Sequence, residues 1–246
     1  MIASPNIWTW PDVYEAENLA HDVDGEIFRV LRECAPWSGR DVVDVGCGSG
    51  FHLPMFAVDA RTVTGIEPHP PLLEQARARI EGMGGVDVLG GTADSIPLSD
   101  ASVDLVHART AYFFGPGCGP GIIEAMRVLR PGGTLVVVDL DATVSPYGQW
   151  MRRDLPHYDP ATVERFFDAQ GFELRRVPTR WSFRDRSTLA AVLGIEFSPR
   201  VAALAIGETT GLSLSVGYRV HTRRKPAGVE RVGSSSSGSG PHIALP

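Results

Sequence analysis

The stretch 41–50, Asp-Val-Val-Asp-Val-Gly-Cys-Gly-Ser-Gly, constrains the fold of this chain more than any other feature. A short β-branched run is followed by glycines at alternate positions, which predicts a buried parallel strand, a tight turn and then a helix. Glycine permits positive φ and lets a ligand approach the backbone, and the first N–H groups of a helix can receive an anion. We therefore expect a nucleotide-like cofactor at this turn; a glycine-rich turn without a ligand is the alternative.

Three later segments place further groups at the ends of predicted strands. Segment 62–68, Thr-Val-Thr-Gly-Ile-Glu-Pro, ends in Glu67, and one carboxylate can accept hydrogen bonds from both hydroxyls of a ribose. Segment 91–97 follows a third strand and places Asp94 where an adenine amino group could be read. Segment 128–139 has the pattern of a helix end, a Pro-Gly-Gly turn and a further apolar strand. The glycine spacing of the first turn differs from the Gly-x-Gly-x-x-Gly of dinucleotide-binding folds.

In this order and at these distances, the segments resemble the class I S-adenosylmethionine-dependent methyltransferases, and most closely their small-molecule branch, the type 11 methyltransferase domain. The resemblance covers about residues 40–140, and its motifs are specific for the cofactor S-adenosylmethionine rather than for a substrate. It implies an α/β fold with a doubly wound, Rossmann-like seven-stranded sheet, mostly parallel with an antiparallel edge strand and with helices on both faces. It also implies in-line transfer of a methyl group to an O, N or C nucleophile of a small molecule.

The hydrophobic pattern agrees with such a sheet. Strands are expected near 41–45, 61–66, 86–89, 103–108 and 133–139, with helical segments between them. Alternating strands and helices predict a parallel, doubly wound sheet, whose ligands bind beyond the carboxyl ends of the strands. Each motif falls at such an end, so the motifs predict one shared site.

The chain divides into an N-terminal helical cap (1–38), a methyltransferase domain (39–225) and a C-terminal stretch (226–246). The cap contains a predicted amphipathic helix over residues 11–35. The C-terminal stretch includes Gly-Ser-Ser-Ser-Ser-Gly-Ser-Gly, which is typical of a flexible tail or of a remnant of cloning.

The second half of the domain has a weaker pattern. Asp159-Pro160 is typical of a helix N-cap, with proline at the first helical position. Segments 172–183 and 212–222 alternate as strands do, and the resemblance makes them an antiparallel pair at one edge of the sheet. Residues 185–206 are expected to be helical and to cover that edge.

The resemblance assigns parts of the cofactor to particular residues. Glu67 suits the ribose diol and is expected beside the pocket, outside the core, while Pro68 offers an apolar surface under the adenine. Asp94 and the N–H of Ser95 would read the adenine edge. Asp44 either orients the glycine turn or meets the ammonium group of the ligand. The alternatives are an exposed acid at Glu67, an Asx turn or cap at Asp94 and a structural role for Asp44.

Three further candidates complete the cofactor site. Cys47 lies within the glycine turn, where a small side chain is expected to pack rather than react. Arg109 ends the fourth strand, where the family contacts the methionine part, with a salt-bridged surface arginine as the alternative. Tyr14 is a candidate lid residue or a core aromatic. The candidate cofactor-binding residues are therefore Tyr14, Asp44, Gly46, Cys47, Gly48, Gly50, Glu67, Pro68, Asp94, Ser95 and Arg109.

Two aromatic segments after the fourth and fifth strands, 110–121 and 141–158, are expected to line the acceptor pocket and favour a small organic acceptor. His157 is the candidate catalytic base, because histidine titrates near neutral pH; a surface or capping histidine is the alternative. No metal site is predicted; Asp139 and Asp141 are interpreted as turn residues, and metal ligands are the alternative for this pair.

The composition narrows the choice of partners. The formal net charge of −6 argues against charge-driven binding to nucleic acid or to an anionic membrane. After the fourth strand the chain reads Ala-Arg-Thr-Ala (108–111) and not the Asn-Pro-Pro-Tyr that in the family accompanies methylation of planar amino groups. We therefore expect a small-molecule methyl acceptor, no nucleic acid and no membrane, and a monomer or homodimer.

The cysteines at positions 34, 47 and 118 have no Cys-x-x-Cys spacing, which favours a reducing compartment. No apolar run has membrane-spanning length and no signal peptide is recognisable, so a cytoplasmic location is expected.

Two other classes of protein remain as alternatives. A nicotinamide-dependent oxidoreductase is disfavoured by the glycine spacing, and the Tyr-x-x-x-Lys pair of short-chain reductases cannot occur because Lys225 is the sole lysine. A non-catalytic cofactor-binding or scaffold protein of the same fold stays open, because a fold does not determine function.

Overall fold

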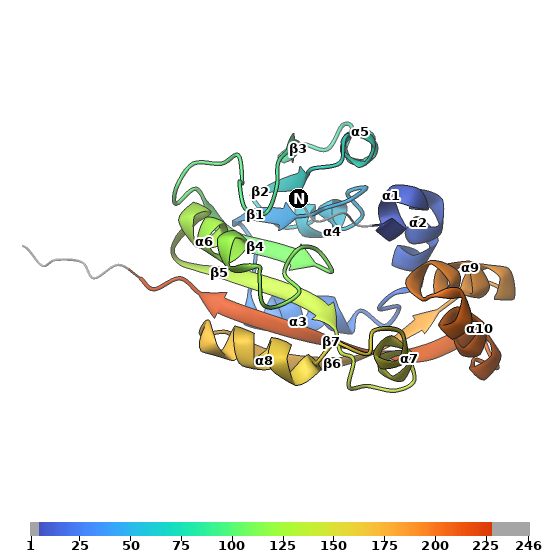
Figure 1. Ribbon diagram of the computed structural model, residues 1–246. Coiled ribbons are helices and arrows are strands. Elements are labelled where there is room, and N and C mark those ends of the chain that lie inside the picture. The colour runs from blue at the N-terminus through green and yellow to red at the C-terminus, as the bar shows by residue number, and fades with distance from the viewer. Residues whose placement is uncertain (1–4, 228–246) are drawn as a thin grey trace, which may run out of the picture.

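The structure, a computed structural model, describes residues 5–227 and consists of one twisted sheet with helices on both of its faces (Figure 1). The predicted serine- and glycine-rich tail lies outside the described residues. No helix among residues 5–227 is long and apolar enough to span a bilayer.

Seven strands form the sheet in the order β3-β2-β1-β4-β5-β7-β6. The first five are parallel, and β7 runs antiparallel to both of its neighbours, so the predicted fold class is confirmed. Their bounds are β1 Asp41–Val45, β2 Thr62–Glu67, β3 Val86–Gly90, β4 Val103–Arg109, β5 Leu129–Leu140, β6 Glu173–Ser182 and β7 Ser213–Arg224.

Ten helices are found in the described part of the chain. They are α1 Pro5–Thr9, α2 Pro11–Ala20, α3 Glu26–Cys34, α4 Leu53–Ala57, α5 Pro70–Arg79, α6 Gly119–Val128, α7 Tyr147–Asp154, α8 Pro160–Ala169, α9 Arg186–Glu196 and α10 Pro199–Glu208.

The alternation of side chains along the strands produces two cores, one on each face of the sheet. In β1, which is buried throughout, Val42 belongs to the apolar cluster that contains α3, α4 and α5. Its neighbour Val43 belongs to the cluster that contains α6 and α8. A continuous β-branched run is what a strand with two covered faces requires.

The order of the strands determines where a ligand can bind. The chain leaves β1 for β2 on one side and later returns to β4 on the other, and Asp44 of β1 is in register with Gly65 of β2 and His107 of β4. The carboxyl ends of these three strands therefore meet at the switch point of the sheet, where open α/β sheets bind ligands.

The single helix predicted over residues 11–35 is wrong. The helix is interrupted between α2 and α3, where Gly25 has φ of 72° and Asp22 has φ of 42°. The Asp22 carboxylate accepts a hydrogen bond from the Ile27 N–H at 2.9 Å, which satisfies a free donor in the first turn of α3. The glycine and the capping aspartate thus start a second helix.

The Pro-Gly-Gly segment is not a separate turn before the fifth strand, because β5 already begins at Leu129. The pairing of β4 with β5 changes register between Val103 and Leu105, and Gly132 has φ of 82° there. A Cβ atom on Gly133 would lie 2.9 Å from the Asp104 carbonyl oxygen. The glycines therefore form an irregularity inside a longer strand.

In the C-terminal half, the antiparallel pair is formed by β6 and β7, as expected. Asp159 caps α8 and accepts hydrogen bonds from the N–H groups of Ala161 at 3.0 Å and Thr162 at 3.2 Å, so the predicted N-cap is confirmed. Residues 185–206 fall mostly in two helices, α9 and α10, which pack on each other and on α2 and α7 rather than along the edge of the sheet (Figure 1).

His221 of β7 shows how the core beneath α8 accommodates polar groups. Its ring stacks on Phe167 at 4.3 Å between centroids, and the side chain is buried. Burial, with the nearby charge of Arg219, lowers the pKa of His221 from 6.5 to about 4. The unfolded chain therefore binds this proton more readily than the folded chain between these two pH values.

We expect the free energy of unfolding to fall as the pH is lowered from 6.5 to 4, by up to about 3 kcal/mol from this group. In His221→Gln this dependence should be flatter, whatever the loss of absolute stability at neutral pH. Urea unfolding across this pH range measures both slopes, and His157→Gln is the control, because His157 is exposed. Parallel pH profiles for His221→Gln and the wild type would contradict the assignment.

Candidate functional site

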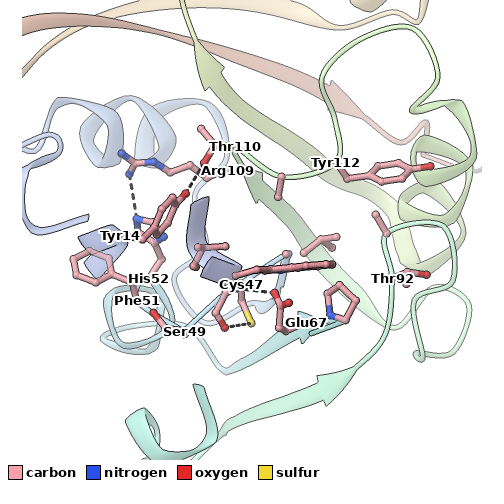
Figure 2. Close-up of a pocket in the computed structure, with 18 of the residues that line it drawn as sticks. Tyr14, Cys47, Ser49, Phe51, His52, Glu67, Thr92, Arg109, Thr110 and Tyr112 are labelled. Carbon is pink, nitrogen blue, oxygen red and sulfur yellow. Dashed lines mark hydrogen bonds between the residues drawn. The ribbon is translucent and has the colours of Figure 1, made fainter. Parts of the chain in front are cut away.

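A cavity of about 280 Å³ opens at the carboxyl ends of β1, β2 and β4 (Figure 2). Its wall combines the glycine turn, the ends of the strands and two N-terminal helices. The lining residues are Ile7, Trp8, Tyr14, Asn18, His21, Val45, Gly46, Cys47, Gly48, Ser49, Phe51, His52, Glu67, Pro68, Gly91, Thr92, Ala93, Asp94, Arg109, Thr110, Ala111, Tyr112 and Phe114.

The first two glycines of the turn lie in the wall of the cavity, and both have positive φ. A Cβ on Gly46 would lie 2.5 Å from the Cβ of Ala111, and one on Gly48 would lie 2.7 Å from Ile7 Cδ1. Gly50 is not part of the wall; a Cβ there would lie 3.1 Å from the Cβ of Ala76. Gly50 thus permits close packing against α5, and the shape of the cavity does not support its predicted contact with the cofactor.

Glu67 connects the end of β2 to the glycine turn. Its Oε2 accepts a hydrogen bond from the Gly48 N–H at 3.0 Å, and its Oε1 accepts one from the His69 N–H at 2.8 Å. The residue is only 4% exposed, so the expectation that it lies outside the core is wrong. Burial raises the pKa of its carboxyl, while the two N–H groups oppose this shift. The carboxyl group is thus fixed at the cavity wall, and each oxygen retains a second acceptor position.

Two of the three residues predicted to contact the adenine line the cavity, and one does not. Pro68 and Asp94 line the cavity, and Asp94 Oδ1 accepts a hydrogen bond from the Thr92 hydroxyl at 2.5 Å. Ser95 does not line the cavity, and its N–H donates to the Thr92 carbonyl at 3.1 Å. Because that donor closes a local turn, the geometry does not support the prediction that the Ser95 N–H reads an adenine.

Asp44 lies behind the cavity wall and not in it. Its Oδ1 is 2.8 Å from Nδ1 of His107, its neighbour on β4, and both side chains are buried. This pairing favours the structural role that the sequence left as the alternative for Asp44, and the contact with the ammonium group of a ligand stays a prediction. The carboxylate joins two central strands immediately below the glycine turn.

Arg109 lies inside the cavity wall, so the alternative of a salt-bridged surface residue is wrong. The residue is 9% exposed, and its Nη1 and Nη2 lie 3.2 Å from His52 Nε2 and 3.3 Å from His21 Nδ1 (Figure 2 shows the first contact). Burial and the charge of Arg109 lower the pKa of both histidines well below the usual range. Since arginine can only donate, both imidazoles accept its hydrogen bonds in their neutral form.

Tyr14 lies in the cavity wall contributed by α2. Its hydroxyl is 3.5 Å from the hydroxyl of Thr110, just after β4 (Figure 2). Burial raises the pKa of the phenol, so it remains protonated at neutral pH. Tyr14 thus brings the N-terminal helices against the end of β4.

Cys47 lines the cavity but is buried against β2, where a Cβ on Gly65 would lie 2.7 Å from its Sγ. Burial raises the pKa of this thiol well above its usual value, which disfavours the reactive thiolate. The geometry matches the packing role expected from the sequence.

Several lining residues were missed by the sequence interpretation. Trp8 of α1 stacks on His69 with 4.5 Å between ring centroids, and Asn18 and His21 follow from α2. His52 comes directly after the glycine turn. The aromatic residues clustered before and within α2 were an available signal that the N-terminal segment covers an apolar site.

Only one of the two segments predicted to line the acceptor pocket lies in the wall of the cavity. The loop after β4 contributes Thr110, Ala111, Tyr112 and Phe114 to the cavity, but segment 141–158 contributes nothing. It turns away because α7 packs on β7 and α10.

The aromatic side chains of segment 141–158 have partners elsewhere. Tyr147 donates to Glu196, Trp150 Nε1 donates to Glu208 at 2.6 Å, and Tyr158 is hydrogen-bonded to Arg219. His157 is exposed and outside the cavity, which favours the alternative of a surface histidine over the predicted catalytic base.

The acidic residues at the end of β5 and just after it, Asp139 and Asp141, have partners within the protein. Asp139 pairs with Arg219 at 2.8 Å, and Asp141 accepts from the Thr143 N–H at 2.9 Å and pairs with Arg176 at 2.5 Å. No group of three or more histidine, cysteine, aspartate or glutamate side chains in residues 5–227 could hold a metal ion.

The residues of the cavity fit a nucleoside with an amino acid attached. Glu67 offers acceptors for a diol, Pro68 and Ala93 provide apolar surface, and Thr92 and Asp94 provide further polar groups in the wall. Gly46 and Gly48 leave space that a Cβ would fill. Arg109 adds a positive charge within the same cavity.

Comparisons with known proteins agree with this geometry. Residues 43–137 match a family model described as a methyltransferase domain. Over 161 residues the chain is 29% identical to the ubiquinone/menaquinone biosynthesis C-methyltransferase of Rubrivivax gelatinosus, covering 58% of this chain and 63% of that protein. Over 163 residues it is 32% identical to the tRNA U34 carboxymethyltransferase of Cellvibrio japonicus, covering 61% and 50%.

The YcgJ protein of Bacillus subtilis has the same fold, with a TM-score of 0.60 at 16% identity, covering 83% of this chain and 100% of that one. The chain spans less than two thirds of the length of the curated relatives described above. Residues 43–137 are therefore a methyltransferase domain of the S-adenosylmethionine-dependent type, which implies S-adenosylmethionine as the cofactor.

Proposed function

We propose that this protein transfers a methyl group from S-adenosylmethionine to an O, N or C nucleophile of a small molecule. The observation that carries the proposal is the Glu67 carboxyl group, which the Gly48 and His69 N–H groups hold at the cavity wall beside the glycine turn. Two acceptor oxygens fixed next to a turn without Cβ atoms suit a ribose diol with its attached chain.

In this proposal the side chains of the protein bind and orient the cofactor and the acceptor, and none of them forms a covalent bond to either. When bound, the cofactor supplies a methyl group already activated on a sulfonium, so alignment and exclusion of water account for most of the protein's part. Trp8 and Tyr14 close one side of the cavity, and Tyr112 and Phe114 form another part of the wall. His21 and His52 both accept from Arg109, so neither has the nitrogen of that contact free to take a proton.

A small acceptor is favoured over a nucleic acid by the wall around the opening. Phe51, Tyr112 and Phe114 are aromatic, and Arg109 is 9% exposed and therefore withdrawn from the surface. A net charge of −6 opposes the binding of a polyanion. The similarity to a quinone C-methyltransferase points the same way, whereas the tRNA-modifying relative defines the competing hypothesis. Cytoplasmic location and a monomeric or homodimeric state remain parts of this proposal.

The test is methyl transfer from S-adenosylmethionine labelled with tritium in the methyl group. The purified protein is incubated separately with a fraction of small metabolites and with bulk tRNA. We expect label in the small-metabolite fraction. Label confined to tRNA would contradict the proposed acceptor, and cofactor binding without transfer to either fraction would favour the non-catalytic alternative.

Glu67→Gln should weaken the binding of S-adenosylhomocysteine by about 1–3 kcal/mol, because charge-assisted hydrogen bonds to a diol are lost. Glutamine keeps the shape of the side chain and, with its one acceptor oxygen, the contact with the Gly48 N–H; it loses the contact with the His69 N–H, and we still expect the protein to fold. Isothermal titration measures the change, and Glu74→Gln on the exposed face of α5 is the matched control. Wild-type affinity in Glu67→Gln would remove this residue from the binding site.

Gly46→Ala should weaken cofactor binding for two separable reasons, backbone strain at φ of 73° and the contact at 2.5 Å with the Cβ of Ala111. Gly82→Ala has the same strain at φ of 79° but open space around the new Cβ, so it should lose about 1 kcal/mol of stability and no affinity. Adding Ala111→Gly to Gly46→Ala should restore part of the affinity. Equal affinities of the Gly46→Ala and Gly82→Ala variants would show that the turn does not shape the site.

A further inference from the structure

The contact between α2 and α9 holds one wall of the cavity in place. Apart from its contact with α1, helix α2 packs chiefly on α9 (Figure 1). The same helix contributes Tyr14, Asn18 and His21 to the wall of the cavity. Each of the two helices brings a carboxyl group to their contact, Glu17 from α2 and Glu196 from α9.

The two carboxyl groups meet inside the protein. Glu17 is 3% exposed, and its carboxyl group is hydrogen-bonded to that of Glu196. Its Oε2 is buried, and no donor group of residues 5–227 reaches this oxygen. Two ionised carboxylates can only accept, so the contact requires one proton between them. A shared proton satisfies the Glu17 oxygen and removes the repulsion of two like charges.

The other contacts of Glu196 indicate which partner keeps its charge. Its Oε1 accepts a hydrogen bond from the Asn6 amide of α1 at 2.8 Å, and its Oε2 accepts one from the Tyr147 hydroxyl of α7. These two donors oppose the effect of burial on the pKa of Glu196. Burial and the neighbouring Glu196 raise the pKa of Glu17 well above its usual range. The proton therefore resides on Glu17, and the pair links four helices.

The titratable and charged groups around the pair keep their charge between pH 6 and 9. They are Tyr14 and His21 of α2, Tyr147 of α7, Arg109 of β4 and Tyr218 of β7. Burial raises the pKa of the three phenols and lowers that of the imidazole, so all four stay neutral. The arginine stays charged throughout. Glu17 is thus the member of this cluster that loses a proton as the pH rises.

Loss of that proton would place two negative charges side by side in a buried contact, which is costly. We propose that the Glu17–Glu196 pair is a proton-dependent latch, which holds α1 and α2 over the cavity while one proton is shared and releases them when it is lost. Release would take the side chains of α2 out of the cavity wall. The predicted effect on the cofactor rests on the proposed function, whereas the movement of α2 is measured without a ligand.

The sign of the pH dependence follows from the direction of the pKa shift. The folded protein holds the Glu17 proton more tightly than the unfolded chain, in which the ordinary pKa is 4.5. The stabilisation from the latch is therefore complete below pH 4.5 and is lost as the pH rises through the raised pKa of Glu17.

Hydrogen–deuterium exchange of the peptides covering α2 measures the latch. The wild type, Glu17→Gln and Asp12→Asn are compared side by side at each pH between 6 and 9, so that the intrinsic pH dependence of exchange cancels. The glutamine amide donates to Glu196 at every pH and keeps an acceptor oxygen, so Glu17→Gln imitates the protonated state. Asp12 is an exposed acid on the same helix, and its substitution is the matched control.

Relative to Glu17→Gln, the α2 amides of the wild type should exchange faster by up to about tenfold for each pH unit above the pH at which the pair loses its proton, because release accompanies the loss of one proton. Asp12→Asn should follow the wild type. Peptides of β1 and β4 should exchange alike in all three proteins. The affinity for S-adenosylhomocysteine should fall over the same pH range in the wild type and stay level in Glu17→Gln.

Identical exchange of α2 in the wild type and in Glu17→Gln at every pH would overturn the latch, whether or not S-adenosylhomocysteine binds. The predicted pH dependence of α2 exchange without binding of S-adenosylhomocysteine at any pH would instead overturn the proposed function and leave the latch intact.

If Glu17→Gln does not fold, Glu196→Gln provides the same comparison, because its amide donates to the Glu17 carboxylate and removes the pair of like charges. The wild type alone also decides. Protection of the α2 amides that stays constant from pH 6 to 9, after correction for intrinsic exchange, contradicts the latch.

Discussion

The hydrogen bond from the Gly48 N–H to the Glu67 carboxyl group is the interaction on which the site depends. It crosses from the glycine turn after β1 to the end of β2, so it couples two strand ends that the topology brings together. A second hydrogen bond from the His69 N–H fixes the other oxygen. The same carboxyl group therefore shapes the turn and presents acceptors to the cavity. Because this acid is buried, the same side chain contributes to the packing of the fold and to the ligand site.

The opposite end of the cavity is built differently. Arg109 comes from β4, while His21 comes from α2 and His52 from the turn that leads into α4. Three segments distant in sequence thus surround one guanidinium. The N-terminal helices are therefore part of the binding site and not only a cover of the sheet. Tyr14 makes the corresponding contact with Thr110 on the same side.

The sequence predicted those features that depend on local pattern. The β-branched run, the alternating glycines and the strand-end acid at Glu67 each require a particular backbone shape, so they identified the turn and the central strands. Gly25 and Asp22 were also local signals, in their case for a break between two helices. The apolar periodicity of residues 11–35 led to the prediction of a single helix instead. The Pro-Gly-Gly segment was misplaced because the pairing of β5 with β4 continues across it.

Features that depend on tertiary packing could not be predicted. His157 was an attractive base by residue type, but α7 packs on β7 and leaves this histidine exposed outside the cavity. Asp44 pairs with His107 because β1 and β4 are neighbours in register, which no spacing in the sequence reveals. The burial of Arg109 follows from the placement of α2 over the end of β4. These differences concern both the acceptor side and the methionine side of the predicted site, whereas Glu67, the predicted ribose contact, lines the cavity.

The most direct test of the central claim is an isothermal titration of the wild-type protein with S-adenosylmethionine and S-adenosylhomocysteine, with NADH and NADPH as controls. The cavity with Glu67 beside the Gly46–Gly48 turn predicts binding of both sulfur-containing nucleosides and of neither nicotinamide cofactor. Binding of NADPH without binding of S-adenosylhomocysteine would contradict it.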